Sequence, residues 1–188
     1  MQQAKKRDHK VLITDTAIEK VSYVQIPGLT RHQCELLQAA QRDTLKLAML
    51  ENVSNEVAIA FNLETGERAV VFGDVDNVDV EHSIDMRALK DSSYAMELAL
   101  IHNHPSTSNF SFADIDYFLA DDYMGLMAVI TNQGESYVLY KKRNYDFDKL
   151  QTIKRHLMRE YSLNRQDLIV KEFLKCCSAG GVGYVKGN

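Results

Sequence analysis

The chain has 188 residues, of which 45% are hydrophobic and 26% charged, and its formal net charge at pH 7 is -4. This composition is typical of a globular domain large enough to bury a core, and no apolar stretch approaches the roughly 18 to 20 residues of a membrane span. The acidic balance, with a pI near 5.9, excludes a general electrostatic attraction to nucleic acid or to an anionic membrane.

The start of the chain and the cysteines bear on the compartment. Residues 1–7 are basic, but the apolar run that follows, Val11–Thr14, is far too short for a secretory signal. Cys34 and the adjacent pair Cys176 and Cys177 have neither the spacing of a disulfide framework nor that of a zinc knuckle. We therefore expect a cytoplasmic protein with free thiols.

The first quarter of the chain predicts two short strands and one long helix. Residues 10–15 and 20–26 have the composition of strands. Thr30 and Gln33 then form the sequence pattern of a capping box, and apolar residues recur behind them at helical spacing. We expect a helix over residues 30–51.

The middle of the chain interleaves strands with helices. Two β-rich runs around a Thr-Gly turn, 55–64 and 68–72, predict a hairpin. Residues 73–84 are acidic but lack the EF-hand order of calcium ligands, so we expect a solvated loop. A short helix, a strand, a helix and two strands are then expected over 84–90, 96–101, 111–122, 125–131 and 136–140. This order predicts an α/β (α+β) fold, a mixed β-sheet flanked by helices.

The composition changes after residue 143. Apolar residues at helical spacing predict one amphipathic helix over 147–161 and another over 168–174, and we expect both to pack on the core. The glycine-rich run 180–184 lacks the Lys-Ser/Thr pair of a phosphate loop, so we expect a flexible tail there. The sequence thus divides into a domain, 1–143, and a helical C-terminal extension with its tail, 144–188.

Two histidines stand at the polar end of the strand predicted over 96–101. His102 and His104 are two residues apart, so in a strand their side chains point to the same face, about 6 to 7 Å apart along the chain. Asp114 follows in the first turn of the next predicted helix, where it can turn back toward the imidazoles. Ser111 and Asp114 also form a helix N-cap pair, a role that requires no chemistry. Two imidazole nitrogens and one carboxylate oxygen are the ligands of a catalytic zinc with a fourth position for water, so we expect Zn²⁺ at His102, His104 and Asp114.

Hydrolysis of an amide at such a site also requires a general base. Glu56 offers one, because it stands where the first strand of the hairpin begins. Glu51 and Glu64 are alternatives, at the end of the long helix and at the hairpin turn. A solvated carboxylate is expected at both of those places, which favours Glu56.

These residues together resemble the JAB/JAMM (MPN+) metalloprotease superfamily. The resemblance rests on His102-x-His104, Ser111-x-x-Asp114 and the upstream Glu56, and it covers roughly residues 30–140. The string His-Asn-His-Pro-Ser is similar in particular to the bacterial RadC-like branch. The loop between His104 and Ser111 is one residue shorter than is usual in the family, so the shared pattern is not complete.

The resemblance implies a JAB/MPN-like (cytidine-deaminase-like) fold with Zn²⁺ at the two histidines and Asp114. It implies that Glu56 takes the proton of the attacking water and passes it to the leaving amine. It also implies that Ser111 donates a hydrogen bond to the oxyanion. The expected activity is that of a peptidase or isopeptidase that cuts after an extended tail, such as that of a ubiquitin-like modifier.

Other families that contain a His-x-His pair fit less well. Cupins expect a Glu three or four residues after the second histidine, where Ser108 and Asn109 stand. Metallo-β-lactamase-like enzymes expect Asp and His at the positions of Ser106 and Thr107. A second hypothesis remains open: a RadC-like metal-binding accessory protein, associated with DNA or a mobile element, that is not a protease. The acidic pI makes direct contact with nucleic acid the weaker expectation.

Overall fold

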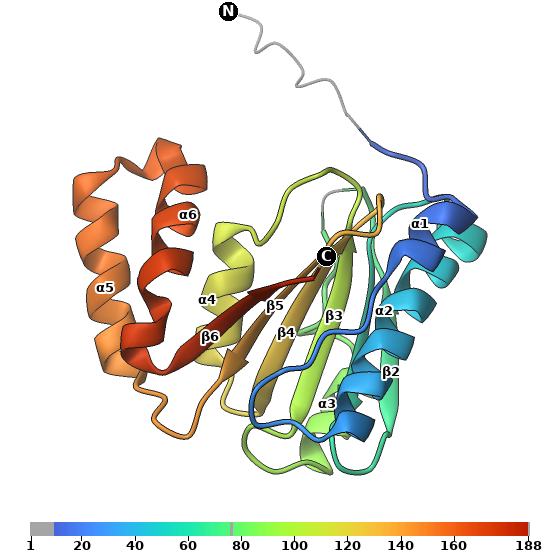
Figure 1. Ribbon diagram of the computed structural model, residues 1–188, viewed down its shortest axis with the longest axis horizontal. Helices are drawn as coiled ribbons and strands as arrows, with labels where there is room; N and C mark the ends of the chain where they lie inside the picture. Colours follow the sequence, from blue (N-terminus) through green and yellow to red (C-terminus); the bar gives the residue numbers. More distant parts are fainter. Residues whose placement is uncertain (1–9, 76, 188) are drawn as a thin grey trace, which may run out of the picture.

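A mixed six-stranded β-sheet with helices on both faces forms the centre of the chain (Figure 1). This computed structural model describes residues 10–75 and 77–187, so the basic start and Asp76 of the acidic loop lie outside it. The helices are α1 Asp15–Lys20, α2 Arg31–Glu51, α3 Ile84–Asp91, α4 Phe112–Ala120, α5 Phe147–Glu160 and α6 Gln166–Cys176, with short 3-10 helices at Leu163–Arg165 and Cys177–Gly180. The strands are β1 Val57–Asn62, β2 Arg68–Phe72, β3 Leu98–His104, β4 Met124–Thr131, β5 Ser136–Lys141 and β6 Val182–Lys186.

The strand order is β2-β1-β3-β4-β5-β6, and only the central pair, β3 and β4, is parallel. Every residue of β1, β3 and β4 is buried, as expected of strands that are covered on both faces. His102 lies beside Ala58 of β1 and Val129 of β4 in the register. The two histidines therefore lie at the end of one of the two central strands. His102 is paired with both neighbouring strands, and His104 with β4.

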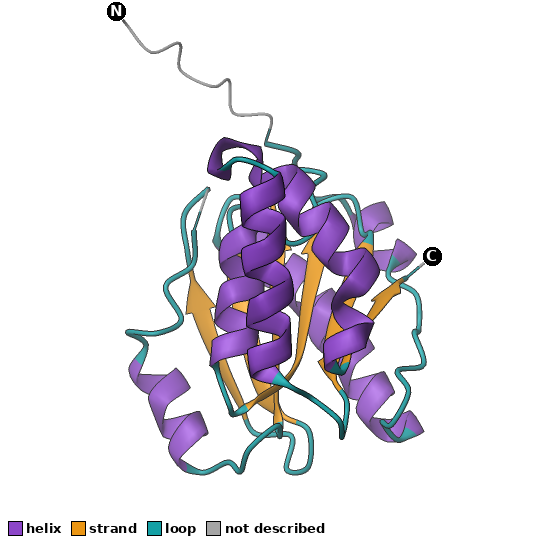
Figure 2. Ribbon diagram, turned by 90° about the vertical axis from the view of Figure 1, so that its left-hand side faces the viewer, coloured by secondary structure: helices purple, strands orange, loops and turns teal. Residues whose placement is uncertain are grey.

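The two faces of the sheet carry separate hydrophobic clusters. Helices α1 and α2 cover one face, and α3, α4, α5 and α6 cover the other (Figures 1 and 2). Leu98 and Leu100 belong to the second cluster, whereas Ala99 and Ile101 belong to the first, as the alternation of side chains along a strand requires. His102 and His104 continue the Leu98–Leu100 row and so lie on the α4 side. Among the described residues, no helix combines the length and the apolar character needed to cross a membrane.

Most of the predicted elements are confirmed. The long helix begins at Arg31, and Thr30 and Gln33 form both hydrogen bonds of the capping box. The hairpin, the helix after the acidic loop and the two later strands lie where they were expected. The strand predicted over 96–101 runs on to His104, so both histidines are part of it.

The prediction of two strands before Pro27 was wrong. Thr14 caps a short helix, α1, by accepting a hydrogen bond from the backbone N–H of Ala17 (3.3 Å). Asp15 stands in the first helical turn and Lys20 in the last, where each charge is favourable. The β-branched residues before and after α1 have the composition of strands. The capping threonine followed by an acidic residue is instead the pattern of a helix start.

The flexible tail predicted at residues 180–184 was also wrong, because β6 pairs there with β5 and closes the sheet. Gly181 has a φ of 78°, a left-handed conformation that glycine adopts without strain. A side chain at Gly183 would overlap the ring of Tyr140, at 2.1 Å from its Cζ. The glycines therefore allow close approach to neighbouring chain and are not a sign of disorder.

The helices after residue 143 belong to the same hydrophobic core as α4 and the sheet. Leu150, Phe173 and Val182 are each at most 1% exposed and pack in one cluster with Leu100 and Phe118. The prediction that these helices pack on the core is confirmed.

Replacing Phe173 is accordingly expected to destabilise the whole chain. Phe173→Ala should lower the free energy of unfolding by about 3 to 5 kcal/mol, because it removes a fully buried aromatic ring. Leu163→Ala, at a residue that is 57% exposed, should change it by less than about 0.5 kcal/mol. Urea titrations followed by circular dichroism and by fluorescence should give coincident transitions. A separate early transition of the C-terminal helices would contradict a shared core.

Candidate metal centre

Strand β3 fixes the direction of both histidine side chains. His102 and His104 are 4% and 7% exposed, and their ring centroids lie 4.9 Å apart. Their Nε2 atoms are 3.1 Å apart. Because a strand repeats every two residues, both rings emerge on the face that α4 covers.

A capping box at the start of α4 brings Asp114 to the two imidazoles. Ser111 Oγ accepts a hydrogen bond from the Asp114 N–H (3.1 Å), and Asp114 Oδ2 accepts one from the Ser111 N–H (2.6 Å). The same carboxylate reaches the histidines: Oδ1 lies 3.2 Å from His102 Nε2 and Oδ2 3.5 Å from His104 Nε2. The capping role and the ligand role, which the sequence left as alternatives, are thus compatible in one side chain.

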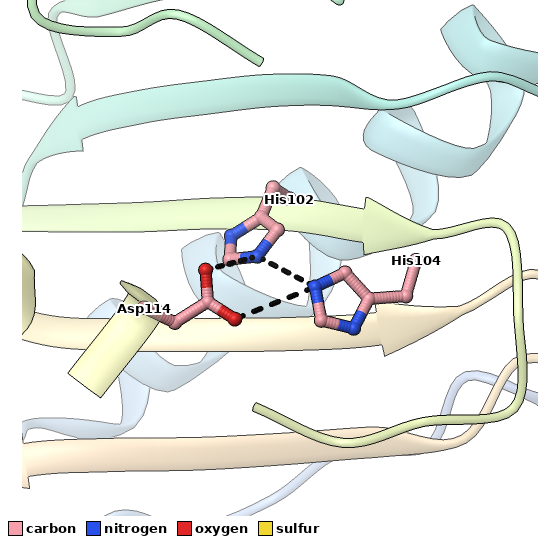
Figure 3. A group of neighbouring side chains, drawn as sticks. All are labelled: His102, His104 and Asp114. Carbon is pink, nitrogen blue, oxygen red and sulfur yellow. Dashed lines mark hydrogen bonds and ion pairs between the residues drawn. The ribbon is translucent and has the colours of Figure 1, made fainter. Parts of the chain in front are cut away.

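The three side chains converge on one small volume, as Figure 3 shows. One ligand atom from each of His102, His104 and Asp114 lies within 4.8 Å of the other two, a spacing that allows all three to bind a single metal ion. Among the residues that the structure describes, this is the one such group. The loop that is one residue short therefore still delivers Asp114 to the histidines.

A backbone carbonyl sets the tautomer of His104. Its Nδ1 lies 3.2 Å from the carbonyl oxygen of Ser108, which can only accept, so Nδ1 carries the proton. The lone pair is then on Nε2, the atom that faces Asp114 and His102. Metal-binding histidines are held in this way by a carbonyl or carboxylate at the second nitrogen.

The Asp114 carboxylate lies between two imidazoles, and this arrangement shifts the pKa values of Asp114 and His104. Burial raises the pKa of Asp114, but the charges and hydrogen bonds of His102 and His104 lower it more, to well below its usual range. Burial lowers the pKa of His104, but the hydrogen bond and charge of Asp114 and the charge of Glu56 outweigh it and raise that pKa above its ordinary value. Asp114 therefore favours the protonated form of His104 in the metal-free protein.

These shifts predict opposite pH dependences with and without metal. The contribution of His104 to the stability of the metal-free protein is fully present below its unfolded pKa of about 6.5 and is lost as the pH rises through its higher folded pKa. The contribution of Asp114 is present above its unfolded pKa of about 4 and is lost only as the pH falls through its lowered value. Metal binding releases the histidine proton, so the stabilisation by zinc should instead grow with pH.

Urea unfolding at pH 6, 7 and 8, in EDTA and in excess Zn²⁺, measures both dependences. In EDTA the stability of the wild type should fall over this range, and His104→Gln should remove that part of the slope. The gap between the zinc and EDTA curves should widen with pH in the wild type. A gap between the zinc and EDTA curves that is the same at all three pH values would contradict zinc binding at His104.

Glu56 lies in the same cleft, which has a volume of about 1070 Å³. The cleft is also lined by the three metal-binding candidates and by Ser111. Glu56 is 8% exposed and directly precedes β1, as expected. Glu51 and Glu64 are exposed, at the end of α2 and in the hairpin turn, and neither is among the residues that line the cleft. Of the three acidic candidates, the fold brings Glu56 to the histidines.

Comparison of the chain with protein-family models, with curated proteins and with solved structures finds no match. The function of the chain is therefore inferred from the side chains that line the cleft and from their order in the sequence.

Two features of the site were not predicted. The acidic loop forms a wall of the cleft through residues 77–81, in addition to being solvated. Asn103, between the two histidines, is fully buried on the opposite face of β3, and its amide bonds to the chain around Glu56. No sequence signal indicated the position of the acidic loop. Asn103, however, is a polar residue between two histidines in a strand predicted to be buried, and this pattern could have indicated that its side chain has a hydrogen-bond partner.

Proposed function

We propose that the chain is a zinc-dependent hydrolase of the JAMM type, which cuts a peptide or isopeptide bond. The observation that carries the proposal is the convergence of His102, His104 and Asp114 to within 4.8 Å on a cleft that Glu56 also lines. The order of these residues along the chain, with Ser111 three residues before Asp114, supports the same reading. A JAB/MPN-like arrangement of the mixed sheet is part of the proposal.

The donor set fits zinc. Two imidazole nitrogens and one carboxylate are typical of catalytic zinc sites, in which the fourth position is open. The Ser108 carbonyl at His104 Nδ1 supplies the outer hydrogen bond that such ligands usually have. The same donor set also binds Fe²⁺ in oxygenases, so the identity of the metal is a direct test of the proposal.

The zinc, Glu56 and Ser111 would each have a defined role in hydrolysis. Bound zinc lowers the pKa of water to about 7 and polarises a carbonyl. Glu56 accepts a proton at its carboxylate and returns it to the nitrogen of the leaving amine, a step that contributes about 10²- to 10⁴-fold. Ser111 Oγ uses a lone pair to cap α4, which leaves its hydrogen free to stabilise the oxyanion, a contribution of about 10²- to 10³-fold.

The size of the cleft favours an extended chain as the substrate. Its volume of about 1070 Å³ is slightly larger than the roughly 300 to 1,000 Å³ that small-molecule sites occupy. An extended tail, such as that of a ubiquitin-like modifier, is the substrate class that we propose. Its amide linkage would lie between Glu56 and the ligand cluster.

Metal analysis combined with a cleavage panel tests the proposal. The purified chain should contain about one zinc per molecule, and it should cleave at least one member of a panel of ubiquitin-like fusions and their isopeptide-linked forms. Iron in place of zinc, or no metal after reconstitution, would refute the zinc site. Stoichiometric zinc without cleavage of any fusion would favour the RadC-like accessory role, and a salt-dependent DNA-binding assay would then test that alternative.

A further inference from the structure

Asn103 is a buried polar side chain for which the reaction described above has no use. It is 0% exposed and lies on the opposite face of β3 from His102 and His104. Its neighbours in that row, Ala99 and Ile101, pack under α2 in an apolar cluster. A buried amide in such surroundings is costly unless its hydrogen bonds are satisfied, so the partners of Asn103 indicate what it holds in place.

Those partners are the two peptide groups on either side of Glu56. Asn103 Oδ1 accepts a hydrogen bond from the Val57 N–H (2.7 Å), and Asn103 Nδ2 donates to the Asn55 carbonyl (3.0 Å). The backbone register between β1 and β3 ends at Ala58 and His102. Beyond that pair, the Asn103 side chain replaces the strand partner on the β3 side. The N–H and carbonyl of Glu56 itself bond on the other side, to the Asp74 carbonyl and the Gly73 N–H, so the chain at Glu56 is held from both edges.

A second buried amide holds the first. Asn132, 1% exposed, accepts the other Nδ2 hydrogen of Asn103 at its Oδ1 (2.8 Å). Its own Nδ2 donates to the carbonyls of Ser54 (2.9 Å) and Val11 (2.7 Å). Ser54 has a φ of 58°, a left-handed conformation that persists in a non-glycine residue only where its surroundings hold it. The two amides thus hold the carbonyls of Ser54 and Asn55 in the chain that leads into Glu56.

We propose that Asn103 is a positioning residue for Glu56, and that Asn132 holds Asn103 in the required orientation. The inference rests on the proposed function, in which Glu56 is the base. One tripeptide of β3 then aligns both halves of the site: its two histidines point to the metal on one face, and its asparagine sets the position of the base from the other. Neither Asn103 nor Asn132 is among the residues that line the cleft.

Acetohydroxamate binding to the Co²⁺-loaded protein tests this inference without a known substrate. Co²⁺ reports its coordination through its visible spectrum, and a metal-bound hydroxamate donates a hydrogen bond to an acceptor beside the metal. Glu56→Gln and Asn103→Ser should each weaken acetohydroxamate by about tenfold, the value of one charge-assisted hydrogen bond. The Co²⁺ spectrum without acetohydroxamate should be the same in both variants as in the wild type.

The double variant separates positioning from a general structural role. If Asn103 acts through Glu56, adding Asn103→Ser to Glu56→Gln should weaken acetohydroxamate by less than about twofold further. Asn62→Ser is the matched control, because Asn62 is 1% exposed at the other end of β1 and binds Ser93 and two backbone N–H groups there. This control should lower the melting temperature and leave acetohydroxamate affinity unchanged. Where Asn103→Ser is too unstable to assay, Asn103→Thr suits the strand better and also lacks the amide, so it should weaken acetohydroxamate in the same way.

The possible outcomes distinguish this inference from the function on which it rests. A wild type that binds no Co²⁺, or a Glu56→Gln variant that binds acetohydroxamate as the wild type does, would overturn the proposed function and the inference together. A Glu56→Gln variant with weakened binding beside an Asn103→Ser variant with normal binding would overturn the inference alone. A double variant that binds acetohydroxamate about tenfold more weakly than Glu56→Gln does would also overturn the inference alone.

Discussion

Glu56→Gln is expected to abolish hydrolysis while leaving the metal in place. The amide has the shape of the carboxylate but cannot accept a proton, so kcat should fall by about 10²- to 10⁴-fold. Glu56 lines the cleft without belonging to the group of three ligands, so the zinc content should stay at about one per chain. KM should change little, because the lost interaction belongs to the transition state. Steady-state kinetics on the best substrate of the panel and metal analysis of the same sample measure both.

The alternative acidic residues supply the control for this experiment. Glu51→Gln and Glu64→Gln change exposed carboxylates at the end of α2 and in the hairpin turn, and both variants should keep full activity. A Glu56→Gln variant that still turns over at the rate of the wild type would exclude Glu56 as the base. Loss of zinc from the same variant would instead identify Glu56 as a ligand.

The ligand cluster could be predicted from the sequence because its geometry is set locally. His102 and His104 share a face wherever the strand forms, and the capping pair Ser111 and Asp114 fixes the first turn of α4. Only the loop between His104 and Ser111 was undetermined, and Asp114 still reaches both Nε2 atoms. Local periodicity and a helix cap thus define most of a three-residue group that could hold a metal ion.

Glu56 depends instead on a long-range pairing that periodicity does not encode. It comes to the histidines because β1 pairs with β3 and because Asn103 extends that pairing past Ala58. The sequence could rank Glu56 above Glu51 and Glu64 by their surroundings, but it could not show what fixes the backbone of Glu56. A hydrogen bond between residues 46 positions apart has no local pattern.

The segments that were predicted wrongly are those in which tertiary contacts outweigh composition. Residues 10–14 look like a strand but form no regular secondary structure. The Val11 N–H donates to the Pro105 carbonyl, and the Val11 carbonyl accepts from Asn132. The run 180–184 looks like a loop but forms an edge strand, because its glycines admit the ring of Tyr140 and the backbone near Asn144. In both places the partner that decides the conformation is far away in the sequence.

Asp114→Asn should remove the metal without removing the helix cap. An asparagine oxygen can still accept the hydrogen bond of the Ser111 N–H, but it no longer supplies an anionic ligand. Zinc affinity should fall by more than about 100-fold, since the loss of an outer-shell partner alone costs about 10- to 100-fold. Hydrolysis should be lost with the metal.

The variants at this position also separate the two roles of Asp114 by their effect on stability. At a zinc concentration about 1,000 times the dissociation constant, binding stabilises the wild type by about 4 kcal/mol, which raises the melting temperature by about 10 °C. Asp114→Asn should lose this rise, and Asp114→Ala should lose it and about 1 kcal/mol more in EDTA, because the hydrogen bond that the Asp114 side chain accepts from the Ser111 N–H is also lost. If zinc raised the melting temperature of Asp114→Asn as much as that of the wild type, the ion would lie elsewhere, because an ion held by His102 and His104 in this cleft needs the Asp114 carboxylate as its third ligand.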